Sequence, residues 1–266
     1  MIELTSAQMN QWIIEFLWPF VRVLAFVAAA PIFRHSSMPR MIQIGVAAML
    51  SFTMVPGLPP MPAIPVISWA GGWLIIQQVL IGVALGFVVR LVFAAIQMSA
   101  NIIGFQMGLS FASVFTPDSG GTTMVLARFF DLIAMMLFLA LNGHLYMLEV
   151  LRDTFILLPI GATSLNANAW QTVALWGSMI FSAGLLLALP LVTSLLIVNM
   201  AMGILNRAAP QLTIFSIGFP MTLLFGVVLL TFLLPEMGGI FEGLFKQGLD
   251  MMSELSTQLG QPPAPS

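Results

Sequence analysis

Apolar residues dominate the chain between Thr154 and Pro235, where Arg207 is the single charged side chain among 82 residues. Soluble domains carry a charge on about a quarter of their residues, whereas a helix that spans a bilayer needs about 20 mainly apolar residues. Segments of that kind occupy roughly residues 12–33, 41–55, 72–95, 124–151, 170–199 and 213–234. The pattern predicts an all-α, polytopic, membrane-associated protein with about six long apolar helices arranged as hairpins.

Proline interrupts this pattern. The second segment is short and ends in a proline-dense turn at 56–62, and Pro19 and Pro190 lie inside the first and fifth segments. Proline removes a backbone hydrogen bond from a helix, and the freed groups are tolerated at membrane depth only inside protein or beside water. We therefore expect many of these segments to face other subunits rather than lipid.

The pattern changes after Pro235. Apolar residues recur at helical spacing between residues 237 and 259, with charged residues elsewhere, which predicts an amphipathic helix at an interface or on a partner. Residues 260–266 are rich in proline and are expected to be disordered. Without a linker or a tandem repeat, residues 1–259 are interpreted as a single helical domain.

Basic residues suggest an orientation. Arg34 and Arg40 follow the first apolar segment, and Arg207 follows the fifth. Because cytoplasmic loops are enriched in Lys and Arg, these loops are expected inside and both termini outside, although Arg152 favours the opposite orientation.

Composition narrows the function classes. The net charge is −2, so no basic surface is expected for nucleic acid. There are no cysteines and only two histidines, and the motifs of phosphate-binding loops, zinc proteases and nucleophile elbows are missing. We expect neither enzymatic activity nor a cofactor or metal.

A polar stripe runs through the third apolar segment at steps of three and four residues, which lie on one helical face. Its members are Gly82, Gly86, Arg90, Ala94, Gln97, Asn101, Gly104 and Gly108. The glycines allow close helix packing, whereas Arg90, Gln97 and Asn101 would be costly against lipid. Either Arg90 is satisfied inside a packed helix, or this face borders a conduit or a subunit seam.

Residues 105–122 are too apolar for a solvated loop and too rich in breakers for a long helix. Such a segment either packs as a re-entrant loop or closes a pore as a hydrophobic constriction.

Further charges occur at membrane depth. Arg128 and Asp131 are three residues apart and can neutralise each other or relay protons. Glu15 and Arg22 share a helical face and are expected to pair with partners across an interface.

Residues 199–220, NMAMGILNRAAPQLTIFSIGFP, closely resemble the signature block of the flagellar biosynthetic protein FliR family. Phe33-Arg34 and residues 104–112 also resemble that family, and the resemblance covers about residues 12–234. It implies a hetero-oligomeric helical export gate in the bacterial inner membrane, within the flagellar basal body, that passes unfolded flagellar substrates. The implied partners are FliP-like and FliQ-like gate subunits, an FlhB-like switch protein and membrane lipid.

The resemblance also implies roles for particular segments. A FliP-like part would cover about 1–165 and a FliQ-like hairpin about 166–235, with its tip at the cytoplasmic entrance. The tip residues are Asn206, Arg207, Pro210 and Gln211. The family's plug falls on 105–122, which makes Phe105, Met107, Leu109, Phe111, Val114 and Phe115 the expected sealing residues.

Two alternatives remain beside the flagellar export gate. One is the equivalent subunit of a virulence type III secretion system, which belongs to the same family. The other is a stand-alone proton-coupled transporter that uses Arg90, Arg128, Asp131 and Glu149, for which an inverted repeat would be expected but is not found in the sequence.

Overall fold

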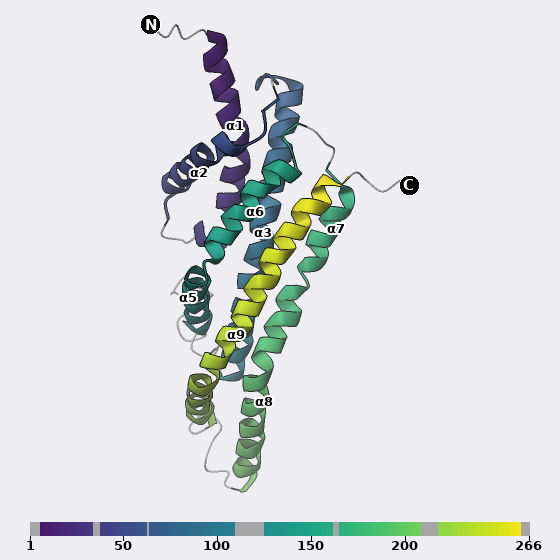
Figure 1. Ribbon diagram of the computed structural model, residues 1–266. Helices are drawn as coiled ribbons and strands as arrows, with labels where there is room; N and C mark the ends of the chain where they lie inside the picture. The colour runs from purple at the N-terminus through teal and green to yellow at the C-terminus, as the bar shows by residue number, and fades with distance from the viewer. Residues whose placement is uncertain are drawn as a thin grey trace. The chain divides into compact units, whose positions relative to one another are not determined.

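The computed structural model (Figure 1) describes residues 6–33, 38–62, 64–109, 125–161, 165–208 and 218–261. Within these ranges every regular element is helical, which confirms the all-α class. The α-helices are α1 (Ser6–Ala29), α2 (Arg40–Met54), α3 (Trp69–Gln106), α5 (Val125–Ala140), α6 (Gly143–Leu157), α7 (Ala167–Trp176), α8 (Met179–Ala208) and α9 (Phe219–Gly260). Short 3-10 helices occupy Pro31–Phe33 and Val55–Gly57.

Several helices are long and apolar enough to cross a membrane. In the described part of the chain these are Trp69–Gln106, Ala167–Ala208 and Phe219–Gly260, and a fourth span results if α5 and α6 are counted as one. The expected segments 72–95 and 170–199 lie within the first two of these helices, and residues 219–234 of the third expected segment lie within α9.

The segment expected at 124–151 is not one continuous helix. It is divided into α5 and α6 by a bend at Leu141–Asn142, where Asn142 has φ 57°. Asparagine adopts this left-handed conformation more readily than most residues, because its short polar side chain can satisfy the local backbone. Apolar periodicity alone did not reveal a single-residue break of this kind.

The break expected at Pro235 is absent, because α9 continues through it to Gly260. The residues after Pro235 bury one face of the helix, including Met237, Phe241 and Phe245. Burying a large apolar side chain contributes about 1.5–3 kcal/mol, so several together outweigh the roughly 3 kcal/mol that an internal proline costs. The last apolar segment and the amphipathic helix are therefore one element.

The chain forms two compact units. Unit 1 contains residues 1–91, 142–177 and 247–266, and unit 2 contains residues 92–141 and 178–246. Both α3 and α9 contribute residues to each unit.

The core of unit 1 is built mainly from α1, α3, α6 and the end of α9. Its fully buried side chains include Trp18, Phe26, Leu85, Leu151 and Leu255. Trp176 of α7 also approaches α3, since its indole nitrogen Nε1 donates to the carbonyl oxygen of Val88 at 3.4 Å.

The core of unit 2 is aromatic. The ring of Phe93 on α3 lies 5.6 Å from that of Phe138 on α5 and 5.4 Å from that of Phe245 on α9. Phe138 and Phe245 are 5.0 Å apart, and Phe130 packs edge-on against Phe241 at 6.1 Å. These centroid distances are those of favourable aromatic pairs, so the rings join α3, α5 and α9.

Candidate functional site

The described start of the predicted plug is the end of α3. Gly108 has φ 80°, the Gly108 amide donates to the carbonyl of Phe105 at 3.0 Å, and the Leu109 amide donates to that of Gly104 at 2.9 Å. These two bonds form a Schellman motif, in which glycine takes the left-handed position just after a helix. Gly108 thus ends α3 and does not continue its polar stripe.

The side chains at this helix end point to different environments. Phe105 is 60% exposed, Leu109 is partly buried and Met107 is 2% exposed. A Cβ atom added to Gly226 of α9 would lie 2.6 Å from Cγ and 2.7 Å from Cε of Met107. Gly226 therefore provides the space that Met107 occupies, and this contact attaches the root of the segment to α9. The other predicted sealing residues, Phe111, Val114 and Phe115, lie outside the described residues.

The polar stripe of α3 has different surroundings along its length. Arg90 is exposed, and Asn101 is partly buried. Nε2 of Gln97 donates to Oδ1 of Asp131 on α5 at 2.8 Å. The structure thus gives Asp131 a partner on another helix, in place of the pairing with Arg128 expected from their spacing, and Arg128 is exposed.

The two glycines at the start of the stripe lie against α1. A Cβ added to Gly82 would meet the carbonyl oxygen of Arg22 and, at 2.9 Å, the Cβ of Ala25. At Gly86 it would lie 2.8 Å from the Cβ of Ala29. Only glycine permits this close approach of the two helices. Gly104 is buried near the other end of α3.

Arg22 is the charged side chain most completely buried in the described residues, with 0% exposure. Nε of Arg22 donates to Oε1 of Gln78 at 2.7 Å. Nη1 donates to the carbonyl oxygen of Thr154 at 2.9 Å and to its hydroxyl at 3.2 Å, and Nη2 donates to the carbonyl of Leu158 at 2.9 Å. The guanidinium carbon also lies 4.2 Å from the ring centroid of Phe155. Arg22 therefore joins α1, α3 and α6 within unit 1.

The acceptors of Arg22 explain how a buried cation is tolerated. All are neutral oxygens, and two are backbone carbonyls at the end of α6. Carbonyls at the end of a helix carry partial negative charge. The carbonyl of Thr154 also accepts from the Leu158 amide at 2.9 Å, and Arg22 adds a donor to both it and the Leu158 carbonyl, so Arg22 caps α6 from another helix. Arg22 therefore has its partners inside unit 1, and not across an interface as its position on the face of the first apolar segment predicts. The feature of the sequence that points to a buried Arg22 is Gln78, a polar residue within the apolar α3, which is also buried.

Glu15 does not join this cluster. Its Oε1 accepts a hydrogen bond from Nε2 of Gln11 at 3.0 Å, one turn earlier on α1.

The first two predicted residues of the entrance loop, Asn206 and Arg207, lie in the last turn of α8. Asn206 is partly buried, and Arg207 is exposed in the last helical turn, where a cation is favourable beside the negative end of the helix. Figure 1 shows α8 and the first half of α9, both in unit 2, running in opposite directions. Pro210 and Gln211 lie outside the described residues.

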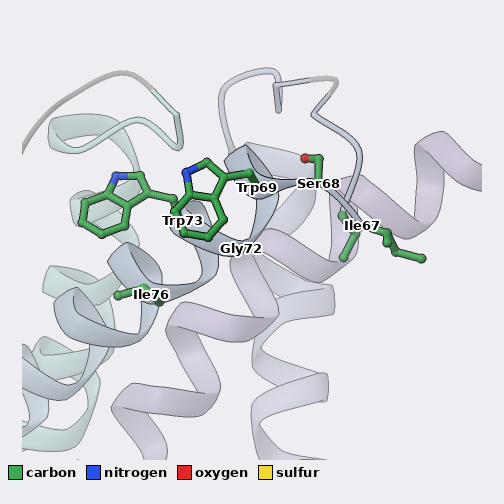
Figure 2. Close-up of a pocket in the computed structure, with 7 residues that line it drawn as sticks. Ile67, Ser68, Trp69, Gly72, Trp73 and Ile76 are labelled. Atoms are coloured by element: carbon green, nitrogen blue, oxygen red, sulfur yellow. The ribbon is translucent and has the colours of Figure 1, made fainter.

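A shallow apolar pocket of about 510 Å³ lies at the start of α3, as shown in Figure 2. Trp69 and Trp73 are 93% and 57% exposed, and both indoles project from the same side of the helix. Ile67 and Ile76 complete its apolar lining. Exposed tryptophan at the end of an apolar helix is typical of a membrane–water interface.

Comparison with known proteins decides the family. A sequence model described as "Bacterial export proteins, family 1" matches residues 13–248, most of the chain. The chain belongs to this export family. The flagellar biosynthetic protein FliR of Escherichia coli K12 is 45% identical over 259 residues, which cover 97% of this chain and 99% of that protein.

More distant members carry the same name. FliR of Buchnera aphidicola subsp. Acyrthosiphon pisum is 42% identical over 237 residues, covering 89% of this chain and 92% of that protein. FliR of Bacillus subtilis is 26% identical over 249 residues, covering 92% and 95%. The export-family likeness therefore extends over nearly the whole length of this chain and of its relatives.

Proposed function

We propose that this chain is a non-enzymatic subunit of the flagellar type III export gate. The observation that carries the proposal is its 45% identity, over nearly its full length, with the FliR of E. coli K12. The proposed site is the bacterial inner membrane within the flagellar basal body. Several helices with the length and apolar character of membrane spans support that location.

The exposed apolar surface supports assembly with other subunits. Large apolar side chains such as Ile197, Met200 and Phe232 are about three-quarters exposed on α8 and α9. Exposed apolar surface of this extent marks an interface with protein or lipid. We propose FliP-like and FliQ-like subunits as the neighbours, with a FliP-like part at about 1–165 and a FliQ-like hairpin at about 166–235.

Two further contacts belong to this proposal. The hairpin tip at 206–212 would lie at the cytoplasmic entrance and contact an FlhB-like protein, and Arg207 at the end of α8 would be cytoplasmic. Unfolded flagellar proteins would be the transported substrates.

Gating is proposed to occur at residues 105–122. Two side chains at the start of this segment have different surroundings: Met107 packs against α9 at Gly226, whereas Phe105 is exposed. Met107 would attach the segment, and the apolar residues beyond it would close the lumen by excluding water. An incoming substrate would displace them.

Deletion of residues 110–122 tests the gate. The deletion leaves the end of α3 and the Met107 contact in place, so assembly should persist. We expect a higher proton and ion leak across the membrane, measured with a potential-sensitive dye in cells that express the assembled gate. An unchanged leak in a gate that still assembles would contradict the plug.

A second readout separates the plug from the wider function. Secretion of flagellar proteins into the medium, and swimming in soft agar, report export directly. A strain that lacks its own FliR should regain swimming with the unaltered chain, and failure of that complementation would contradict the export function itself.

A further inference from the structure

One exposed apolar face extends along the first half of α3, within unit 1. Its members recur at steps of four and three residues and therefore share a side of the helix. They are Trp69, Trp73, Ile76, Leu80, Val83 and Phe87, and the exposed side chain of Arg90 follows at the same spacing. The opposite side of the helix is buried, including Leu74, Ile81 and Leu85. The described residues of the chain therefore leave this face uncovered.

The length of the face matches the thickness of the hydrocarbon core of a bilayer. From Trp69 to Arg90 the helix advances 21 residues, or about 31 Å at 1.5 Å per residue, and the hydrocarbon core is about 30 Å thick. Tryptophan favours one interface, and an arginine side chain extends to the other. Since α3 has 38 residues, or about 57 Å, a bilayer can cover only part of it. The Trp69–Arg90 interval identifies that part.

A groove of about 400 Å³ lies beside this face, between α1 and α3 of unit 1. It is lined by Val21, Leu24, Ala25, Ala28 and Ala29 of α1 and by Val79, Val83, Phe87 and Arg90 of α3. All of these side chains are apolar except Arg90. The small residues Ala25 and Ala29 are also the ones that contact Gly82 and Gly86, so the two helices lie close together at the floor of the groove.

The groove extends over the depth of one leaflet. Val79 and Arg90 are 11 residues apart, or about 16 Å along the helix, which is close to half of the hydrocarbon core. An apolar channel of this length with a cation at its end matches a phospholipid, whose acyl chain is apolar and whose phosphate is anionic.

We propose that this groove binds an anionic phospholipid of the surrounding bilayer, with an acyl chain along Val83 and Phe87 and the phosphate at Arg90. The inference rests on the membrane location in the proposed function and not on export. A lipid is favoured over a partner helix because the Trp69–Arg90 interval matches the thickness of the hydrocarbon core of a bilayer, a length that no partner subunit imposes. The orientation expected from basic loops places the Arg90 end in the cytoplasmic leaflet, where anionic lipids concentrate.

Photo-crosslinking in the assembled membrane protein tests the proposal. The full chain, co-expressed with the other gate subunits, would be reconstituted into two kinds of phosphatidylcholine vesicle. In one kind the photoreactive lipid, which carries a diazirine in one acyl chain, is phosphatidylglycerol. In the other kind it is phosphatidylcholine. Peptide mass spectrometry would then locate the label. We expect labelling of α1 at 21–29 and of α3 at 79–90, stronger with phosphatidylglycerol.

Two variants and their controls separate the acyl chain from the phosphate. Ala28→Phe fills the groove and should abolish most labelling there with both lipids, whereas Ala174→Phe, at an exposed alanine of α7, should not. Arg90→Gln should reduce the preference for phosphatidylglycerol about fivefold, the effect of one basic residue near an anionic surface. Arg152→Gln, at an exposed arginine of α6 in the same unit, should leave that preference unchanged.

Three results would overturn the proposal: labelling spread evenly over the exposed apolar helices, labelling insensitive to Ala28→Phe, or no lipid label in the groove of the assembled gate, as expected if another subunit covers it. These results are independent of export. A gate that labels as expected but secretes no flagellar protein would keep the lipid site and remove the proposed function.

Discussion

At the residue scale, the arginines in the apolar segments differ in burial although they carry the same charge. Arg22, Arg90 and Arg128 all occur in apolar segments, yet Arg22 is fully buried and the other two are exposed. The sequence identifies the charges that require an explanation. It does not identify their acceptors, because Gln78, Thr154 and Leu158 are 56 to 136 residues away from Arg22.

The Arg22 cluster gives the first stability prediction. Arg22→Met supplies an apolar side chain of similar length but leaves the amide oxygen of Gln78 and the carbonyl of Leu158 without their donor, whereas the carbonyl of Thr154 still accepts from the Leu158 amide. Each unsatisfied buried acceptor costs about 1–3 kcal/mol, so we expect a loss of at least about 2 kcal/mol. The midpoint of thermal unfolding in detergent measures it.

Two further substitutions complete that experiment. Arg22→Lys retains the charge, but a single ammonium group cannot reach the acceptors of Gln78, Thr154 and Leu158 together, and it should also lower the midpoint clearly. Arg152→Gln, at an exposed position, should change stability by no more than about 0.5 kcal/mol. Equal midpoints for Arg22→Met and Arg152→Gln would show that the buried hydrogen bonds do not stabilise unit 1.

Alanine substitutions at two glycines of α3 are predicted to change the stability in opposite directions. A Cβ at Gly86 would meet the Cβ of Ala29 and the backbone of α1 at 2.8–2.9 Å, whereas one at Gly72 would meet nothing within 4 Å. Gly86→Ala should therefore cost about 1–3 kcal/mol through overpacking. Gly72→Ala should stabilise α3 by about 0.5–1 kcal/mol, because alanine suits a helix better than glycine. Thermal unfolding of both variants checks this, and two changes of the same sign would contradict the α1–α3 contact.

At the element scale, the long apolar helices could be predicted from hydropathy, but their ends could not. Segments 72–95 and 170–199 fall within observed helices, since 20 apolar residues carry a strong signal. The bend at Asn142 depends on one backbone conformation, and the continuation through Pro235 depends on burial of the face that contains Phe241 and Phe245. Tertiary packing determines both the bend and the continuation of α9, and the local pattern of apolar residues carries no information about that packing.

The contact between Met107 and α9 gives a prediction for gating. Gly226→Val would occupy the space of the Met107 side chain and displace the root of segment 105–122. We expect an increased ion leak in the assembled gate, as with deletion of the segment. Gly238→Val, on the same helix but with nothing within 4 Å of its added Cβ, is the matched control. A leak that is equal in the two variants would argue against Met107 as the attachment of a plug.

At the scale of the whole molecule, the candidate site was predictable in its parts but not in its contacts. The sequence located segment 105–122, the polar stripe and the hairpin tip. The structure added the Schellman motif at Gly108, the Gln97–Asp131 hydrogen bond and the Arg22 cap of α6. Each of these depends on residues distant in sequence or on a single backbone conformation, which periodicity does not encode.

The exposed apolar surface of α8 and α9 and the family membership lead to the same central claim, that this chain functions as one subunit of a larger export gate. The most direct test is to co-express the tagged chain with FliP-like and FliQ-like subunits, purify it from membranes and determine the mass of the intact complex by native mass spectrometry. The account predicts a large hetero-oligomer that contains this chain in low copy number together with both partners. A stable monomer or homodimer that retains neither partner would contradict it.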